Sequence, residues 1–478
     1  MLHFRGKGPR AEGRGPEEGS SLALGPRPSA LLQALGPSSP APRILLLVFA
    51  FCAWSLTAPA NLALALLVLL FLWDLPSGWP RLRRDPAFWL LVGVVLVTAL
   101  LAVRASLLFP DTAGDQWHGV SAWTSPFLFA VVAWWVRAEP EQVWDLLIAA
   151  PLGLALGVLR KSDWSLLPQV LGGMRYHFGY AALGLAFLVS VLLVGLWVFR
   201  ARILATRVRG RPRPWLGWTL WIGGLAFALA ILVVTQSRGA ALMLAGAGLL
   251  YALMQARSRG VSAEGPRTEG RGPRKMGISG PWPLALASGA LIVALAAGLV
   301  WSTWDRQVYD WQELKGSGRD QYNGSLAIRL NLIDVGTTVF AQRPLLGFGP
   351  GTSTTEYLVP RRLVAVADSH LAHVPEISHL HSVPLEILTR FGLLGATIAA
   401  ALIAVLVRAY RGLWRDPQMA PDLRVFLTLG GIMTLLYCIY DFRIVNLDLR
   451  FFFILFFGLV YGLYLARQEP QTRRHADA

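Results

Sequence analysis

Long apolar runs separated by short polar segments dominate the chain. About 20 consecutive apolar residues are needed for one helix to cross a bilayer, so the pattern predicts an all-α polytopic membrane protein with about twelve transmembrane helices. The first two runs meet at Pro59, where either two helices or one long broken helix fits, and the pattern leaves the helix bounds around 119–159 open. The runs lie near 44–58, 60–75, 87–109, 119–136, 143–159, 178–199, 214–236, 239–256, 282–303, 391–408, 424–442 and 451–466.

These runs predict five parts of the chain. The first is a disordered basic tail, rich in Gly, Pro, Ser and Arg and without the apolar core of a signal peptide. Nine helices follow, then a large, partly helical loop, then three helices and a short C-terminal tail. The five parts are 1–42, 43–303, 304–390, 391–467 and 468–478.

The composition agrees with a protein that faces lipid. Charged residues make up 15% of the chain, against roughly 25% in soluble proteins, and the mean hydropathy is +0.49. The net charge of +16 would suggest a nucleic-acid partner in a soluble protein. Here the basic residues cluster in short segments between apolar runs, which indicates membrane orientation and no nucleic acid. Both cysteines, Cys52 and Cys438, lie within apolar runs, so no disulfide framework is expected.

The distribution of Lys and Arg predicts the orientation. With the N-terminus placed inside, the inner segments hold 29 of these residues and the short outer segments hold 7. The loop 304–390 is left out, because long loops cross regardless of charge. The count predicts that both termini are cytoplasmic and that this loop lies at the outer face of the membrane.

The long loop carries its own structural signals. Helical periodicity predicts a helix over 325–342, and the glycine-rich Pro344–Gly351 predicts turns. A second helical stretch begins near His381 and continues to Arg390. The apolar positions that support the first helix are Leu326, Leu330, Ile333 and Val339.

Polar residues gather where the predicted spans meet the outer face. Arg238 lies in a very tight turn between two runs, where it either anchors to headgroups or grips a phosphate with its planar fork. Arg329 lies in the first loop helix and is either a solvated charge or a second phosphate ligand. Asp441 and Arg443 follow the eleventh run, either as a local ion pair or as part of a site.

Four histidines, His370, His373, His379 and His381, form a second cluster in the loop. Their spacing is compatible with a metal site, although no acidic ligands at metalloenzyme spacing accompany them. One histidine acting as a base or hydrogen-bond donor needs fewer assumptions, because its pKa lies near neutrality.

The stretch from His381 resembles a known signature. It reads His381, Ser382, nine residues, Gly392, two residues and Gly395, and so resembles the HSx9GxxG signature of the bacterial O-antigen ligase family. Arg238–Leu242 fits the family's RxxxL pattern, and 343–351 resembles the stretch ahead of its catalytic histidine. The resemblance covers roughly residues 40–465, including the topology.

The resemblance implies a metal-independent, inverting membrane glycosyltransferase with no cofactor, in a bacterial inner membrane with the long loop in the periplasm. Its donor would be a polysaccharide on undecaprenyl diphosphate, its acceptor the lipid A–core oligosaccharide at the periplasmic face, and its surroundings membrane lipids. Arg238 and Arg329 would bind the diphosphate, His381 would act on the acceptor hydroxyl, and Asp441 would support it. The absence of a DxD-type carboxylate pair in the loop fits a metal-free route.

Other functions remain open on the sequence alone. An O-antigen polymerase or protein O-oligosaccharyltransferase of the same superfamily would share the donor and differ in the acceptor. A lipid-linked oligosaccharide flippase is a different class, but transporters place polar groups at mid-depth and often show repeats, neither of which is evident here. A cell-wall polymerase fits the His–Gly signature less well.

Overall fold

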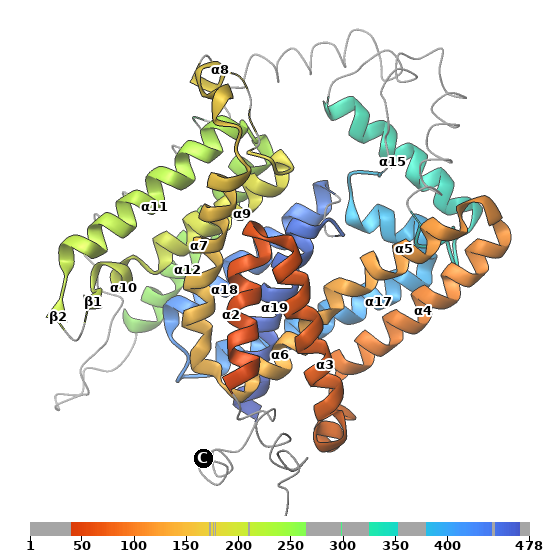
Figure 1. Ribbon diagram of the computed structural model, residues 1–478, viewed down its shortest axis with the longest axis horizontal. Coiled ribbons are helices and arrows are strands. Elements are labelled where there is room, and N and C mark those ends of the chain that lie inside the picture. Colours follow the sequence, from red (N-terminus) through yellow and green to blue (C-terminus); the bar gives the residue numbers. More distant parts are fainter. Residues whose placement is uncertain are drawn as a thin grey trace, which may run out of the picture.

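The computed structural model describes residues 40–171, 174, 176, 178–208, 211–263, 298, 325–351, 379–441 and 445–468. Apart from a two-residue antiparallel ladder, β1–β2, these residues form helices and the turns between them (Figure 1). The first half contains α2 (Pro40–Ser55), α3 (Thr57–Leu82), α4 (Pro86–Leu108), η1 (Pro110–Thr112), α5 (Ala113–Thr124), η2 (Ser125–Leu128), α6 (Phe129–Ala138), η3 (Pro140–Gln142), α7 (Val143–Lys161), η4 (Trp164–Leu166) and α8 (Leu167–Leu171). The second half contains α9 (Ala182–Val198), α10 (Arg200–Leu204), β1 (Arg207–Val208), β2 (Arg211–Pro212), α11 (Pro214–Thr235), α12 (Arg238–Ala263), α15 (Ser325–Gln342), α17 (Val383–Arg415), α18 (Pro421–Tyr440) and α19 (Leu447–Gln468).

Eight stretches of the described chain are long and apolar enough to cross a membrane, which confirms an all-α multi-pass membrane protein. Within the part of the chain that the structure describes, the expected count of about twelve is not reached. Three of the predicted runs form shorter apolar helices, Pro40–Ser55, Ala182–Val198 and Gly239–Met254. The predicted run 282–303 lies outside the described residues except for residue 298, as do the tail 1–39 and most of the loop 304–390.

Two of the open boundaries are now defined. The first two runs are separate helices that break at Leu56, whose backbone is extended, and not at Pro59. Pro59 sits in the first turn of α3, where its missing N–H leaves no helical bond unmade. The run 119–136 is composite, because a 3-10 turn containing Pro126 divides α5 from α6 within the candidate span Pro110–Ala138.

Helix α19 forms the centre of the bundle (Figure 1). In its most apolar stretch 89% of residues are buried inside the protein, so α19 has little surface left for lipid. Its aromatic side chains pack on α2, α6 and α9, as in the edge-on contact of Phe451 with Phe49 at 5.5 Å. Edge-to-face aromatic pairs contribute about 0.5–1.5 kcal/mol beyond the area they bury.

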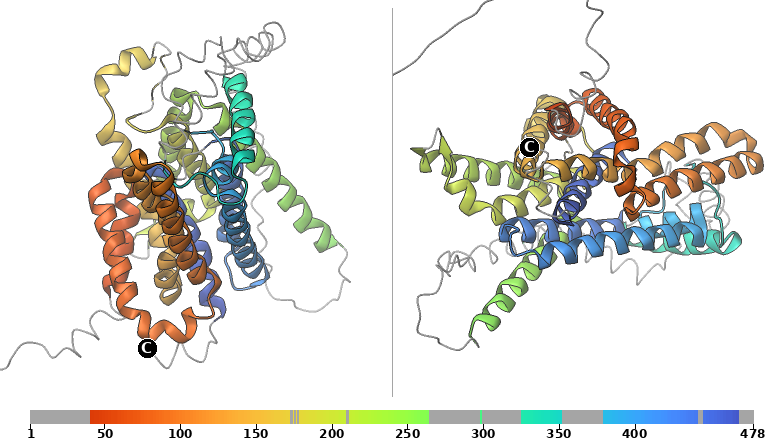
Figure 2. Two further views of the ribbon diagram at one scale, coloured as in Figure 1. Left: turned by 90° about the vertical axis from the view of Figure 1, so that its right-hand side faces the viewer. Right: turned by 90° about the horizontal axis from the view of Figure 1, so that it is seen from below.

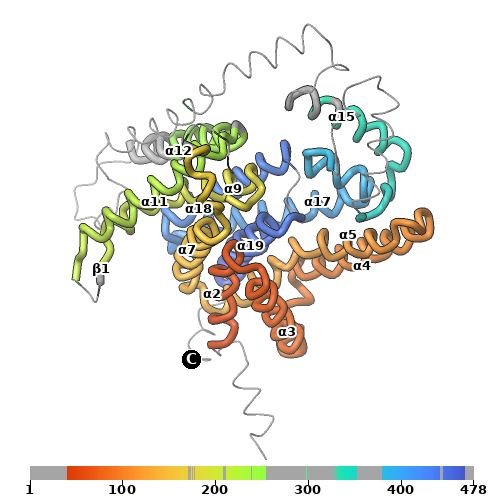
Figure 3. Tube along the Cα trace, turned by 45° about the horizontal axis from the view of Figure 1, so that its top comes forward, coloured from red at the N-terminus to blue at the C-terminus, as the bar shows by residue number. Residues whose placement is uncertain are grey.

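Two groups of helices flank this centre. Figure 2, seen from below, shows α17 running alongside α4 and α5 on one side. In Figure 3, α9, α11 and α12 lie on the other side, while α15 crosses above α17. Ion pairs tie the helices at the end of the bundle away from α15. They are Arg43 with Glu139 and Asp145, Arg202 with Asp422, and Arg467 with Asp416.

Candidate functional site

Helix α17 is broken at Gly392, and this break shapes the site. Gly392 has φ 62° and ψ −153°, a conformation that suits glycine alone. A Cβ atom there would lie 2.5 Å from the carbonyl of Leu345. The sequence predicted that a loop helix ends at residue 390 and that a membrane helix begins at residue 391. The structure has a break close to this point, at Gly392, and the helical segments on either side of it form one bent element, α17.

The predicted turn segment 343–351 supplies the hydrogen bonds that the break removes from the helix. Its amides donate to the last carbonyls of the first half of α17, and its carbonyls accept from the first amides of the second half. Helix ends otherwise leave such groups unpaired. The bonds are Phe348 N–H to Thr389 O (3.0 Å), Gly349 N–H to Arg390 O (2.9 Å), Leu393 N–H to Pro344 O (2.8 Å) and Leu394 N–H to Leu345 O (3.2 Å).

A buried ion pair ties this segment to the histidine turn. Glu386 and Arg390 are fully or almost fully buried, and their side chains meet at 2.6 Å. Arg390 also donates to the carbonyls of Pro350 and Gly351, and Glu386 accepts from the backbone N–H of Leu380. Because each charge is compensated, the pair can fix the residue before His381 relative to the break in α17.

His381 occupies a sharp turn at the start of α17. Its φ of 50° is in the left-handed region, which is uncommon for a residue with a side chain. Such conformations persist only where the surroundings enforce them, and they cluster at functional sites. Its side chain is 27% exposed, so the imidazole remains reachable from outside.

The structure brings Asp441 to His381. Asp441 follows the last residue of α18 and is fully buried. Its Oδ1 atom lies 3.4 Å from Nδ1 of His381, and its Oδ2 atom accepts a 2.6 Å hydrogen bond from the hydroxyl of Tyr437. Since a carboxylate can only accept, a hydrogen bond here requires the proton on Nδ1, which leaves Nε2 as a free base. Arg443, the alternative partner of Asp441, lies outside the described residues.

Three further site elements meet beside this pair. The turn between α11 and α12 comprises only Gln236 and Ser237, which confirms the tight turn expected before Arg238. The backbone of Arg238 begins α12, and its side chain lies outside the description. The hydroxyl of Tyr440 packs against Gly239, the residue after Arg238. A Cβ atom on Gly239 would lie 2.6 Å from that hydroxyl oxygen. Arg329 interacts electrostatically with Tyr440.

The predicted helix that carries Arg329 is confirmed as α15, Ser325–Gln342. Its buried face differs in part from the expected one. Val339 is buried as expected, whereas Ile333 is 49% exposed and Leu332 and Val335 are buried instead. Arg329 itself is partly buried, so it is not simply a fully solvated charge.

A metal site is compatible with part of the histidine cluster. One ligand atom each from His379, His381 and Asp441 lies within 4.8 Å of the others. His370 and His373 lie outside the described residues. A metal site that uses His370 and His373 is therefore not tested. In the described residues, Asp441 lies close to His379 and His381.

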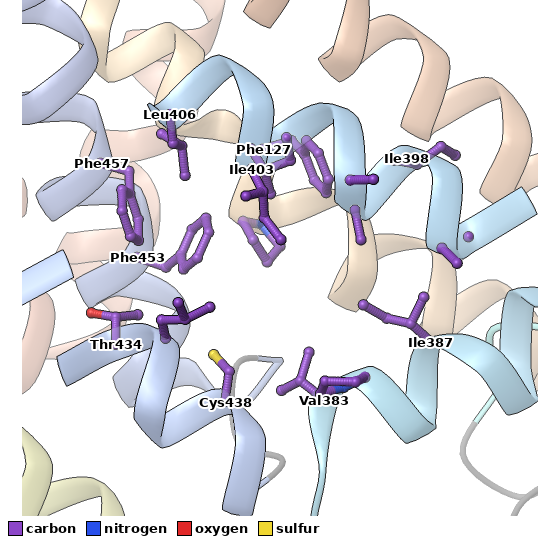
Figure 4. Close-up of a pocket in the computed structure, with 18 of the residues that line it drawn as sticks. Phe127, Val383, Ile387, Ile398, Ile403, Leu406, Thr434, Cys438, Phe453 and Phe457 are labelled. Atoms are coloured by element: carbon purple, nitrogen blue, oxygen red, sulfur yellow. The ribbon is translucent and has the colours of Figure 1, made fainter. Parts of the chain in front are cut away.

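An apolar cavity of about 670 Å³ lies beside the start of α17 (Figure 4). Its wall includes Val383, two residues after His381, and Cys438, three residues before Asp441. Gly395, the last position of the signature, also lines it. The rest of the wall comes from α4, α17, α18 and α19 and from the α5–η2 region, and it contains no charged side chain. Such a cavity suits a hydrocarbon chain.

Four residues that hold the site together were not predicted from the sequence: Glu386, Arg390, Tyr437 and Tyr440. Glu386 and Arg390 are four residues apart within a predicted helix, so their pairing was detectable, although their burial was not. Tyr437 lies one helical turn before Asp441, the same spacing. Tyr440 gave no signal, because its role depends on the approach of α12.

Residues 223–400 match the family model described as O-antigen ligase. The chain contains an O-antigen ligase domain. A comparison with curated proteins gives no match. The O-antigen ligase domain runs from within α11 to within α17. It includes Arg238, Arg329, His381, Gly392 and Gly395, whereas Asp441 lies beyond the matched range.

Proposed function

We propose that the protein is a glycosyltransferase that moves a polysaccharide from undecaprenyl diphosphate to the lipid A–core oligosaccharide. The observation that carries this proposal is the His381–Asp441 pair at the mouth of a helical bundle, in which His381 belongs to the O-antigen ligase domain. The charge bias between short loops supports a periplasmic position for this mouth and cytoplasmic termini.

His381 is the proposed base. Its Nε2 atom accepts the proton of the acceptor hydroxyl while that oxygen attacks the anomeric carbon of the donor. Asp441 holds the ring through Nδ1 and stabilises the imidazolium that forms, and Tyr437 orients Asp441. The bond between the anomeric carbon and the diphosphate oxygen breaks on the opposite face, so the configuration inverts.

The leaving diphosphate gains negative charge as this bond breaks. Arg238 and Arg329 are the proposed cations that stabilise it, without a metal. The hydroxyl of Tyr440 is buried, makes no hydrogen bond within the described part of the chain, packs against Gly239 at the start of α12, and is within the electrostatic influence of Arg329. It is therefore well placed to donate to a diphosphate oxygen.

The apolar cavity lies on another face of α18. Tyr440 and Leu436 of α18 face α12, as their positions against Gly239 and Gly246 show, whereas Leu435, Cys438 and Ile439 line the cavity. Because Arg238, a proposed diphosphate ligand, begins α12, we assign the cavity to a lipid chain of the acceptor. Donor and acceptor then approach His381 from different sides, as an inverting displacement requires.

The test is transfer by the purified protein. Lipid-linked polysaccharide is supplied with lipid A–core, with a second lipid-linked glycan, or with a candidate protein. Label on lipid A–core is the expected result. Chain extension on the lipid-linked glycan would instead identify a polymerase, and label on protein would identify an oligosaccharyltransferase.

A further inference from the structure

The groups around His381 include a set of metal-binding atoms that the proposed reaction does not use together. His379, His381 and Asp441 supply two imidazole nitrogens and one carboxylate oxygen, all within 4.8 Å of one another. This donor set is one that Zn²⁺ and neighbouring divalent transition metals bind. The atoms come from two segments, the turn before α17 and the end of α18.

The arrangement of the three residues favours one ion. The ring centroids of His379 and His381 lie 4.3 Å apart. The Tyr437 hydroxyl donates a 2.6 Å hydrogen bond to the Asp441 carboxylate. A hydrogen bond of this kind orients a carboxylate for ligation. The side chain of His381 is 27% exposed, so an ion can enter and keep water as its fourth ligand.

The distances between the three ligand atoms indicate reversible binding of the ion. Zn²⁺ binds nitrogen and oxygen ligands at about 2.0–2.2 Å, so three ligands of one ion lie closer together than 4.8 Å. The side chains must therefore close slightly around the metal, and Asp441 must partly exchange its contact with Nδ1 of His381 for the ion. Both changes lower the affinity and make binding reversible.

We propose that His379, His381 and Asp441 form an inhibitory site for a zinc-class divalent ion. A ligated imidazole nitrogen has no free lone pair, and a carboxylate bound to a cation no longer stabilises an imidazolium. The ion therefore removes both functions from the pair. The inhibition rests on the proposed function of His381, whereas ion binding does not.

Ion binding is tested with untagged, full-length protein in detergent, titrated with Co²⁺ as the probe. The wild type is expected to give intense visible absorption bands of four-coordinate Co²⁺ that saturate at one equivalent and that Zn²⁺ displaces. His379→Gln should abolish these bands. His118→Gln is the matched control, because His118 is exposed on α5, and it should keep them. Identical spectra for the wild type and His379→Gln would overturn the site.

Inhibition is tested in the transfer assay with added Zn²⁺, each variant being compared with its own metal-free rate. The wild type and His118→Gln should lose activity with the same midpoint and recover it with EDTA. The midpoint for His379→Gln should be at least about tenfold higher, which corresponds to about 1.4 kcal/mol of lost binding. Equal Zn²⁺ sensitivity of all three, or Co²⁺ binding by the wild type without inhibition, contradicts the proposal. A chain that gives the Co²⁺ spectrum but transfers no glycan supports the ion site and contradicts the proposed function.

Discussion

Nδ1 of His381 lies 3.4 Å from Oδ1 of Asp441, although 60 residues separate them in the chain. One residue comes from a strained turn before α17 and the other from the end of α18. Two helices must therefore keep their relative positions for the pair to exist. A histidine whose Nδ1 atom faces a buried carboxylate is suited to take a proton from a hydroxyl through its other ring nitrogen.

The first prediction separates the two members of this pair. His381→Ala removes the base and should abolish transfer, while the protein still reaches the membrane. Asp441→Asn keeps the shape but removes the charge that stabilises the imidazolium, so kcat should fall by about 10²–10⁴-fold, the usual contribution of acid–base catalysis. KM for both substrates should change little. Normal polymer-bearing lipopolysaccharide in cells with His381→Ala would contradict the proposed base.

The second prediction concerns the cation at the start of α12. Arg238→Ala should raise the KM for the lipid-linked donor at least about tenfold, because charge-assisted contacts to a phosphate are lost. Arg238→Lys should recover only part of this, since an ammonium lacks the planar fork. Arg408→Ala, at an exposed position near the other end of α17, is the control and should leave the KM unchanged. Unaltered donor affinity in both Arg238 variants would exclude this residue from the site.

The third prediction tests the break in α17. Gly392→Ala places a side chain in a left-handed conformation and 2.5 Å from the Leu345 carbonyl. The conformation alone costs about 1–2 kcal/mol, so the thermal midpoint in detergent should fall by several degrees. Gly93→Ala is the matched control, because a Cβ there meets no atom within 4 Å, and an alanine favours a helix interior. Equal melting of the two variants would show that the break is not required.

The fourth prediction fills the apolar cavity. Ala399 lines it, so Ala399→Trp should raise the KM for lipid A–core several-fold and leave the KM for the donor nearly unchanged. Ala401→Trp, at a neighbouring exposed position outside the cavity wall, should affect neither. A rise in the donor KM alone would reassign the cavity to the polyprenyl chain.

The fifth prediction concerns metal removal. The proposed route relies on Arg238, Arg329 and His381 for charge and proton handling, so prolonged treatment with EDTA should leave the transfer rate unchanged. The rate is measured before and after chelation and again after Mg²⁺, Mn²⁺ or Zn²⁺ is returned. Loss of activity that one of these ions restores would instead make the histidine cluster part of the catalytic machinery.

The sequence was sufficient where local pattern determines structure. Periodicity predicted α15 with its observed bounds, and the two residues between α11 and α12 followed from adjacent apolar runs. Gly392 was recognised from the sequence as part of the signature, and the structure adds that it breaks a helix. Each of these features depends on residues close together in the chain.

The sequence was insufficient where burial depends on distant elements. Arg390 looks like the end of an amphipathic helix until the carbonyls of Pro350 and Gly351 approach it. Ile333 and Leu332 are both apolar neighbours on α15, and only the position of α17 decides that Leu332 is the buried one. The span count was affected similarly, because α9 is too short to be a candidate span yet is buried among its neighbours.

The segment that completes α17 also contacts helices that lie more than 200 residues earlier in the chain. Residues 343–351 are held by Arg104 of α4, which donates to the Gly347 carbonyl at 3.0 Å, and by Gln116 of α5, which accepts from Gly351 at 2.8 Å. The bent form of α17 therefore has its partners only once the early helices are in place. The proposed site is therefore complete only after Asp441 has been synthesised and residues 343–351 have packed against α4 and α5.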